Sequence, residues 1–328
     1  MTARREEKMQ SRERNAYVSL TLRIAVSVVL VGALAYAVGT TETIAQLRSA
    51  RWEIIALVIT VLASHVFVVA PRWALILRAL GHRTRSLDLI GSVFLGFLFN
   101  QVLPTAVGGD ALRAWRARHL GVPLELAIHS VLIDRASGIA VVLVGTALLL
   151  PVVSLTAASE PFWRAVAITA AAGLIWCAGL WLLSKMAVVS IPLIGRLQHA
   201  LGNFVASTRA LLRRPALAVG VAALAIAGQF IVIGALWLLA KEMQVFLPLI
   251  DIAIVTFGAM LASAIPISIA GWGIREGTLI FLLGAYGVPA EKTFAISVLF
   301  GACMMIAALP GVLFLLSQRN RISDPDDR

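Results

Sequence analysis

The sequence is poor in charged residues. Only 14% of its 328 residues are Asp, Glu, Lys or Arg, whereas a soluble domain carries about 25%. Acidic residues are the scarcest, since 17 of them face 28 lysines and arginines and leave a formal net charge of +11. Hydrophobic residues make up 60% of the chain, and its mean hydropathy is +0.91. This composition argues against a soluble enzyme, a nucleic-acid-binding module and a disordered protein.

The sequence also has few residues that could build a disulfide framework, a metal site or a cofactor site. Its two cysteines, Cys177 and Cys303, each lie inside an apolar stretch, which predicts neither disulfides nor a zinc site. The chain contains no GxxxxGK, HExxH or GxSxG motif and no glycine-rich dinucleotide-binding fingerprint. We therefore expect a transporter rather than an enzyme, with no ATP-driven pumping and no cofactor.

Long apolar runs dominate what is present. A helix that spans a membrane needs about 20 apolar residues, and six runs are long enough or nearly so: 17–39, 54–71, 124–150, 163–183, 215–240 and 291–316. The first run follows the charged segment Met1–Arg14 and is longer than the apolar part of a signal peptide. We interpret it as a retained transmembrane helix.

Two further apolar segments are interrupted. Residues 87–103 end at Pro104 and continue as TAVGGD, and residues 249–265 end at Pro266 and continue as ISIAGWGIREG. Each pattern is typical of a broken helix or re-entrant hairpin, which is tolerated at membrane depth only when it is buried in protein or lines a cavity.

The distribution of positive charge predicts the orientation. If both broken segments return to the side from which they start, the predicted cytoplasmic segments hold 20 of the 28 lysines and arginines, Arg72 among them. The positive-inside rule then favours six spans, two hairpins and both termini in the cytoplasm. We expect a multi-pass protein of the cytoplasmic (inner) membrane, with tails at residues 1–16 and 319–328. Residues 188–214 are too polar to span and predict an amphipathic helix on the cytoplasmic face.

The two interrupted segments resemble each other. Both contain Pro-x4-Gly-x3-Arg, at Pro104 to Arg113 and at Pro266 to Arg275, and both are followed by GVP and then by Ser-Val-Leu. An odd number of predicted spans separates the copies, so the second copy is inverted, as in many secondary transporters. The predicted fold is an all-α polytopic membrane domain over residues 17–318, with repeat A at about 52–150 and repeat B at about 215–316.

Charged residues at membrane depth are the candidate site residues. Each costs about 2.5–3.5 kcal/mol at the centre of a spanning helix, so such residues pair or face a wet cavity. Arg113 and Arg275 follow glycine breaks near the starts of short helices, where helix N-termini and arginine donors suit a lipid phosphate. The alternative is that both only hold the hairpins, Arg113 by pairing with Asp110.

The other candidates carry two interpretations each. We expect Glu276 to point away from Arg275, toward an amine or an arginine across the repeat interface. Asp134 and Arg135 pair with the first hairpin, for example Arg135 with Asp110, or contact the ligand. Asn100 caps freed backbone carbonyls or touches a head group. Gly109 and Gly271 permit tight turns or close backbone approach.

The stretch from Asn100 to Arg135 resembles the first signature of the lysylphosphatidylglycerol synthase transmembrane-region, or flippase-like, family. The matching residues are Asn100, Leu103-Pro104, Gly108-Gly109, Arg113 and Asp134-Arg135, although the family more usually has Glu at position 134. The second signature corresponds to Pro266, Ser268, Gly271, Gly273, Arg275 and Glu276. The resemblance implies a domain that moves lipids between leaflets, here without the synthase domain to which similar domains are fused, and it adds Ser268 to the candidate substrate-binding residues.

Three classes of function stay open at this point. The first is translocation of an anionic or aminoacylated phospholipid or a polyprenyl-phosphate-linked lipid. The second is a membrane-embedded enzyme or an accessory subunit that acts on lipid-linked substrates, and the third is a secondary transporter of ions or small solutes. The expected partners are membrane lipids and a separate lipid-modifying synthase or glycosyltransferase, with no nucleic acid. A homo-oligomer is an open alternative.

Overall fold

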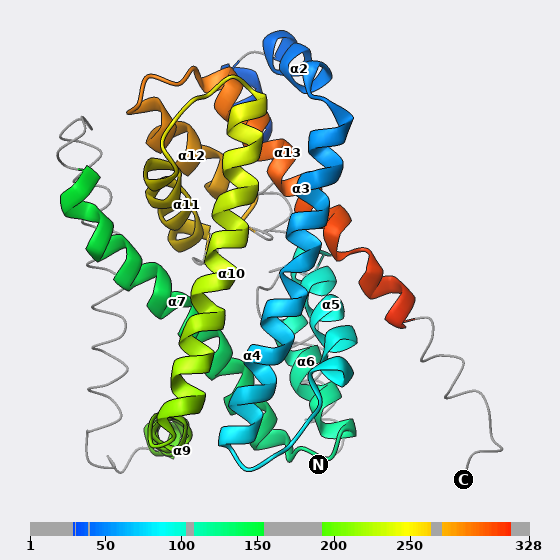
Figure 1. Cartoon of the computed structure of the whole chain (residues 1–328), viewed down its shortest axis with the longest axis vertical. Coiled ribbons are helices and arrows are strands. Elements are labelled where there is room, and N and C mark those ends of the chain that lie inside the picture. Colours follow the sequence, from blue (N-terminus) through cyan, green and yellow to red (C-terminus); the bar gives the residue numbers. More distant parts are fainter. Residues whose placement is uncertain are drawn as a thin grey trace, which may run out of the picture.

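The computed structural model describes residues 29, 31–38, 40–102, 108–153, 192–263 and 271–315, and this part of the chain is helical, with no strand (Figure 1). The helices are α2 (Thr40–Ser49), α3 (Trp52–Ser64), α4 (Val66–Ala79), α5 (Ser86–Val102), α6 (Gly108–His119), α7 (Leu124–Val153), α9 (Pro192–Leu212), α10 (Pro215–Glu242), α11 (Leu249–Ser263), α12 (Ile274–Gly284) and α13 (Ala290–Ala308). The predicted all-α polytopic fold is thereby confirmed.

Four segments of the described chain are long and apolar enough to cross a membrane. They are Trp52–Ala79, Leu124–Leu149, Pro215–Glu242 and Ala290–Leu315. Each corresponds to one of the predicted runs. The predicted run 163–183 and most of the run 17–39 lie outside the described residues.

The first of these spans is longer than predicted. The sequence suggested that it ends before Arg72 and that this arginine lies in a cytoplasmic segment. Instead α4 continues to Ala79, and Arg72 is buried within it at 7% exposure. The prediction for Arg72 is wrong because a buried carboxylate on another helix compensates its charge, as described below.

Two helical hairpins enter the molecule from opposite ends (Figure 1). Helices α5 and α6 form hairpin A, which starts and finishes at the lower end of Figure 1, and α11 and α12 form hairpin B, which starts and finishes at the upper end. The spans that flank hairpin B run in the opposite directions to those that flank hairpin A, which is the arrangement that an inverted repeat predicts. The hairpin tips, with Pro104, Pro266 and Ser268, lie outside the described residues.

Each hairpin is packed in its own apolar core. Buried residues of α4, α5, α6 and the start of α7 surround hairpin A, including Trp73, Val93 and Ala117. Buried residues of α3, α10, α11, α12 and α13 form the larger core around hairpin B. Because each hairpin buries apolar side chains against spanning helices, its polar residues are held at fixed positions between those helices.

The predicted amphipathic helix is α9, which lies across the lower end of the molecule, roughly perpendicular to α10 (Figure 1). Two hydrogen bonds attach it to α7: Asn203 Nδ2 donates to Glu125 Oε1 at 2.8 Å, and Ser207 Oγ lies 3.1 Å from His129 Nδ1. The second contact is buried, so α9 is part of the packed domain.

Candidate functional site

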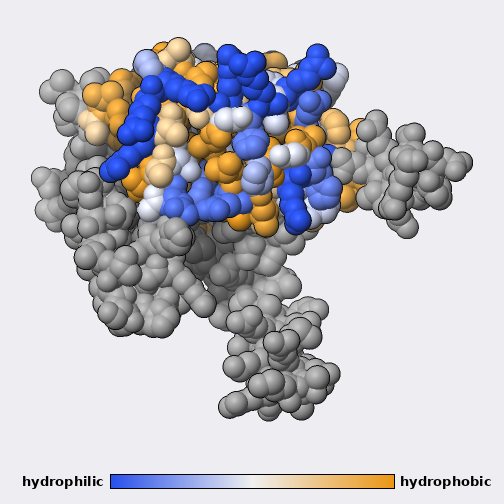
Figure 2. Space-filling model, turned by 90° about the horizontal axis from the view of Figure 1, so that it is seen from below, coloured by the Kyte–Doolittle hydropathy of each residue, from blue (hydrophilic) through white to orange (hydrophobic). Residues whose placement is uncertain are grey.

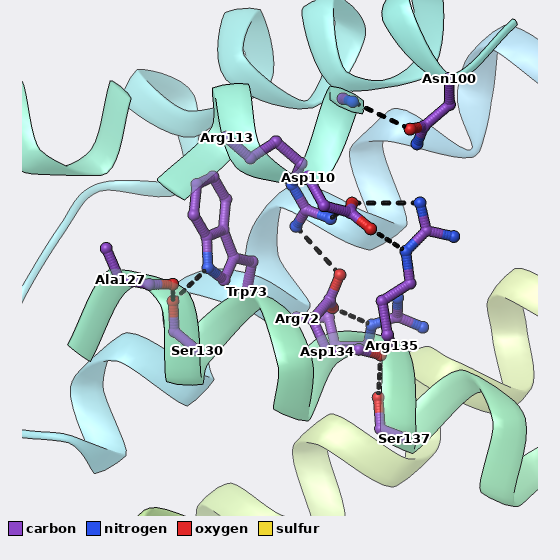
Figure 3. A network of polar contacts seen from close by, with 11 residues as sticks. Arg72, Trp73, Asn100, Asp110, Arg113, Ala127, Ser130, Asp134, Arg135 and Ser137 are labelled. Carbon is purple, nitrogen blue, oxygen red and sulfur yellow. Dashed lines mark hydrogen bonds and ion pairs between the residues drawn. The ribbon is translucent and has the colours of Figure 1, made fainter. Parts of the chain in front are cut away.

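The most polar buried group in the first repeat is centred on Asp134 of α7, which is 1% exposed. Its two carboxylate oxygens accept hydrogen bonds from two arginines of other helices (Figure 3). Arg72 Nε of α4 donates to Oδ1 at 2.7 Å, and Arg113 Nη2 of α6 donates to Oδ2 at 2.9 Å. Asp134 therefore links a span, a hairpin helix and a second span.

A second ion pair lies beside the first. Arg135 donates through Nε and Nη2 to the two oxygens of Asp110, at 2.7 and 3.0 Å (Figure 3). Arg113 Nη1 also lies 3.7 Å from Asp110 Oδ1, so Asp110 faces two arginines. The predicted pairing of Arg135 with Asp110 is confirmed, as is the i,i+3 pairing of Arg113 with Asp110.

These five residues form one unit, which we call the ionic cluster: Arg72, Asp110, Arg113, Asp134 and Arg135. Three formal positive charges meet two negative ones, so the cluster carries one surplus positive charge. The side chain of Arg135 is 48% exposed, whereas those of Arg72 and Arg113 are 9% and 3% exposed. Arg135 is therefore the cluster residue with the most exposed side chain, and its guanidinium is a group suited to phosphate.

Other side chains hold Arg113 in place. The Trp73 ring lies 4.4 Å from the Arg113 guanidinium carbon, and Trp73 Nε1 donates to Ser130 Oγ at 2.8 Å.

Asn100 Oδ1 accepts a hydrogen bond from the backbone N–H of Gly109 at 3.1 Å. Asn100 thus caps the first turn of α6 and satisfies a free N–H, rather than the freed carbonyls that we expected.

The predicted close backbone approach at Gly109 is present. A Cβ atom at this position would overlap the carbonyl oxygen of Gly96, so the two glycines let α5 and α6 cross in contact. Gly96 in turn leaves room for the aliphatic part of Arg113.

The second repeat holds a smaller group around Glu276, which is fully buried. Glu276 Oε1 accepts from Arg275 Nη2 at 2.6 Å and from Ser297 Oγ of α13 at 3.1 Å, and Oε2 accepts the backbone N–H of Gly273. The expectation that Glu276 points away from Arg275 is therefore wrong. The reason is that Glu276 occupies the third position of α12, where its carboxylate closes a capping box with the residue before the helix.

The turn before α12 uses glycine as predicted. Gly271 and Gly273 have φ angles of +78° and +86°, which other residues rarely adopt. A Cβ on Gly271 would also lie 2.8 Å from that of Ser263 at the end of α11. The Arg275 guanidinium is packed near the rings of Trp272 and Phe300, at 4.9 and 5.9 Å.

The polar groups around Asp134 and Glu276 differ in which helix carries the carboxylate. When Ser130-Val-Leu is aligned with Ser297-Val-Leu, Asp134 corresponds to Gly301. A side chain at Gly301 would collide with Arg275 Nη2, so this arginine meets bare backbone where Arg113 meets a carboxylate. The acid of the second repeat is on α12 itself, so hairpin B has no ion pair to a flanking span among the described residues.

The structure thus brings the predicted residues together in two places. Arg113, Asp110, Asp134, Arg135, Asn100 and Gly109 lie at hairpin A, and Arg275, Glu276 and Gly271 lie at hairpin B. Ser268 lies outside the described residues. Within the described ranges, no group of three His, Cys, Asp or Glu side chains is arranged to hold a metal ion.

Arg72 is the cluster residue that the sequence prediction missed. A signal was present, because apolar residues continue after Arg72 as WALIL, which is typical of a helix still within the membrane.

Most of the chain matches one known protein family. Residues 20–311 match the family of the lysylphosphatidylglycerol synthase TM region. The match includes both hairpins and both polar groups. No curated protein sequence matches the chain.

Proposed function

The chain belongs to the lysylphosphatidylglycerol synthase TM-region family, and we propose that it moves a lipid between the leaflets of a membrane. Membership of this family indicates a lipid-related function in a membrane. The ionic cluster is the second ground for the proposal. The proposed cargo is an anionic or aminoacylated phospholipid or a polyprenyl-phosphate-linked lipid. Its phosphate would contact Arg135 and the surplus positive charge of the cluster.

The observation that carries this proposal is the unequal exposure of the cluster. Arg72 and Arg113 are buried against Asp134, whereas Arg135 is about half exposed. A cluster that served only to lock the hairpin would need no surplus charge, and a surplus charge at membrane depth is costly unless an anion or water compensates it. A phosphodiester carries the single negative charge that would neutralise the cluster.

The arrangement of the hairpins supports movement across the membrane. Hairpins A and B enter from opposite ends and meet spans that run in opposite directions (Figure 1). In inverted-repeat transporters, such elements open the central site alternately to the two sides. Arg275 and Glu276, which neutralise each other, would then position hairpin B rather than bind the phosphate.

The engagement of the carboxylates supports a transporter rather than an enzyme. Asp110, Asp134 and Glu276 each accept hydrogen bonds from at least one arginine. A carboxylate whose oxygens are already engaged by arginine donors is poorly placed to exchange a proton with a substrate. The chemistry on the lipid would therefore belong to a separate synthase or glycosyltransferase.

The charge of the lower end supports an orientation. Viewed from below, this end is rich in hydrophilic residues (Figure 2). Its exposed arginines are Arg78, Arg83, Arg85, Arg118, Arg209, Arg213 and Arg214. With the positive-inside rule, this charge supports the proposal that the lower end, with the mouth of hairpin A and α9, faces the cytoplasm. We propose on the same ground that the protein lies in the cytoplasmic membrane with both termini in the cytoplasm.

The proposal is tested by head-group translocation in proteoliposomes that contain the full chain. Acyl-labelled phosphatidylglycerol, lysyl-phosphatidylglycerol and a polyprenyl-phosphate sugar are quenched from outside, for wild type and for Arg135→Gln. We expect wild type to move at least one of these lipids and Arg135→Gln to lower that rate about tenfold or more. Movement of none of them by folded protein would refute the proposal.

A further inference from the structure

Among the buried side-chain atoms of the described residues that have no hydrogen-bond partner, Gln229 Oε1 is an amide acceptor on a spanning helix. Gln229 lies near the middle of α10 and is 7% exposed, and its Oε1 accepts no hydrogen bond. Its Nε2 donates to the carbonyl oxygen of Gly138 in α7 at 3.4 Å, which fixes the amide orientation because only the NH₂ group can donate to a carbonyl. The unpartnered atom is therefore an acceptor.

The position of this acceptor relates it to the cluster. Gly138 follows Arg135 by three residues on α7, and residues at this spacing are neighbours on a helix surface. A Cβ atom at Gly138 would lie 4.0 Å from Gln229 Nε2, an ordinary van der Waals distance, so the amide lies against α7 at this position. The Gly138 carbonyl that Gln229 contacts thus lies about one helical turn along α7 from Arg135.

A buried acceptor without a donor costs free energy, because it has lost water and gained nothing. Such groups in folded proteins are rare, and each calls for a donor that is bound in some state. The surroundings are tightly packed, since a Cβ on Gly228 would lie 2.9 Å from His65 Nε2, and the His65 ring is stacked on Phe97 of hairpin A at 5.5 Å. This contact joins the neighbourhood of Gln229 to the hairpin that we propose to move.

We propose that Gln229 Oε1 accepts a hydrogen bond from a hydroxyl of the lipid head group whose phosphate contacts Arg135. This inference rests on the proposed function and narrows its cargo to hydroxylated anionic head groups, such as a phosphoglycerol or a phosphate-linked sugar.

An ammonium group is a weaker candidate for the same acceptor. The ionic cluster carries a surplus positive charge about one turn away, and like charges repel strongly where little water screens them. A neutral hydroxyl donates to Gln229 without that repulsion. The geometry therefore favours hydroxylated over aminated head groups.

The test compares lipids that share the phosphodiester and differ in the head group beyond it. Full-length protein in liposomes is assayed with acyl-labelled phosphatidylglycerol, phosphatidylmethanol, which has the same charge and no hydroxyl, and phosphatidylethanolamine. We expect wild type to move phosphatidylglycerol about tenfold faster than phosphatidylmethanol. In Gln229→Leu the rate for phosphatidylglycerol should fall to that for phosphatidylmethanol, whose own rate should not change.

A substitution beside Gln229 serves as the matched control. Phe230→Leu, at an exposed neighbour on α10, should keep the lipid preference. Equal rates for phosphatidylglycerol and phosphatidylmethanol in wild type would overturn the inference, and Gln229 Oε1 would then be assigned to a bound water. Faster movement of phosphatidylethanolamine than of the other two lipids would also overturn it. This wild-type comparison decides even if Gln229→Leu fails to fold. Movement of no lipid would instead refute the proposed function, and this inference with it.

Discussion

At the residue scale, the ionic cluster shows how charged groups persist between apolar helices. Asp134 stands between Arg72 and Arg113, at 2.7 and 2.9 Å. Each charge has an opposite charge within hydrogen-bonding distance, which offsets the cost of removing it from water. The cluster is therefore most sensitive at the carboxylate that two arginines share.

Asp134→Asn should destabilise the protein strongly. The change leaves Arg72 buried without a counter-charge and Arg113 with Asp110 alone, at 3.7 Å. Breaking a buried pair from one side costs about 3–5 kcal/mol. Thermal unfolding in detergent measures the effect. Asp88→Asn, at an exposed aspartate in the first turn of α5, is the control and should change stability by less than about 1 kcal/mol. Similar unfolding temperatures for both variants would contradict the assignment of Asp134 as the centre of the cluster.

Gly109→Ala should loosen hairpin A. The added methyl group would overlap the Gly96 carbonyl oxygen, and overpacking of this kind costs about 1–3 kcal/mol. Gly234→Ala, in α10 with no heavy atom within 4 Å of the new Cβ, should not destabilise the protein. The two unfolding temperatures are compared, and a Gly109→Ala protein as stable as Gly234→Ala would show that α5 and α6 do not cross at Gly109.

Sequence reasoning identified most of the cluster but not its full connectivity. The excess of charge in apolar segments pointed to Asp110, Arg113, Asp134 and Arg135, because such charges need partners. Arg72 was missed because its charge interrupts the apolar run, although the apolar residues WALIL that follow it indicate that the helix continues. The direction of Glu276 depends on where α12 begins, which the sequence does not define to within one residue.

At the element scale, the two hairpins differ in how they are attached. Hairpin A is tied to α7 by two ion pairs, Arg113 with Asp134 and Asp110 with Arg135. Arg72 of α4 joins this group only through Asp134. In hairpin B, the ion pair of Arg275 and Glu276 lies within α12, and its polar link to a flanking span is the hydrogen bond from Ser297. We infer that hairpin B moves more easily.

Hydrogen exchange should reveal this difference. Backbone amides of α12 should exchange about tenfold faster than those of α6, which corresponds to a difference of about 1.4 kcal/mol in opening free energy. The measurement is mass spectrometry of the full chain in lipid nanodiscs. Slower exchange in α12 than in α6 would mean that packing in the larger core outweighs the missing ion pairs.

At the scale of the whole molecule, the apolar runs predicted the architecture well. The predicted runs 124–150, 215–240 and 291–316 agree with spans of the structure to within two residues at each end. Agreement is close because the membrane fixes the length of a spanning helix. The arrangement of the hairpins followed from the inverted repeat, whereas their packing depends on glycine contacts such as Gly96 with Gly109 that hydropathy does not contain.

The orientation can be tested with single cysteines. Arg118 at the lower end and Lys241 at the upper end are both exposed. Each is replaced by cysteine, one at a time, in a background that carries Cys177→Ala and Cys303→Ala. We expect a membrane-impermeant thiol reagent to label position 241 in intact cells and position 118 only after permeabilisation. Labelling of position 118 in intact cells would reverse the orientation.

We propose that the guanidinium of Arg135 binds the head-group phosphate and does not merely lock the hairpin. The most direct test exchanges the pair, with Asp110→Arg and Arg135→Asp in one protein. This exchange keeps the net charge and lets the ion pair form again in reverse. We predict a folded protein whose translocation of anionic lipid in proteoliposomes falls about tenfold or more, because a carboxylate now stands where the phosphate would bind. Translocation at the wild-type rate would contradict the claim and assign the pair to structure alone.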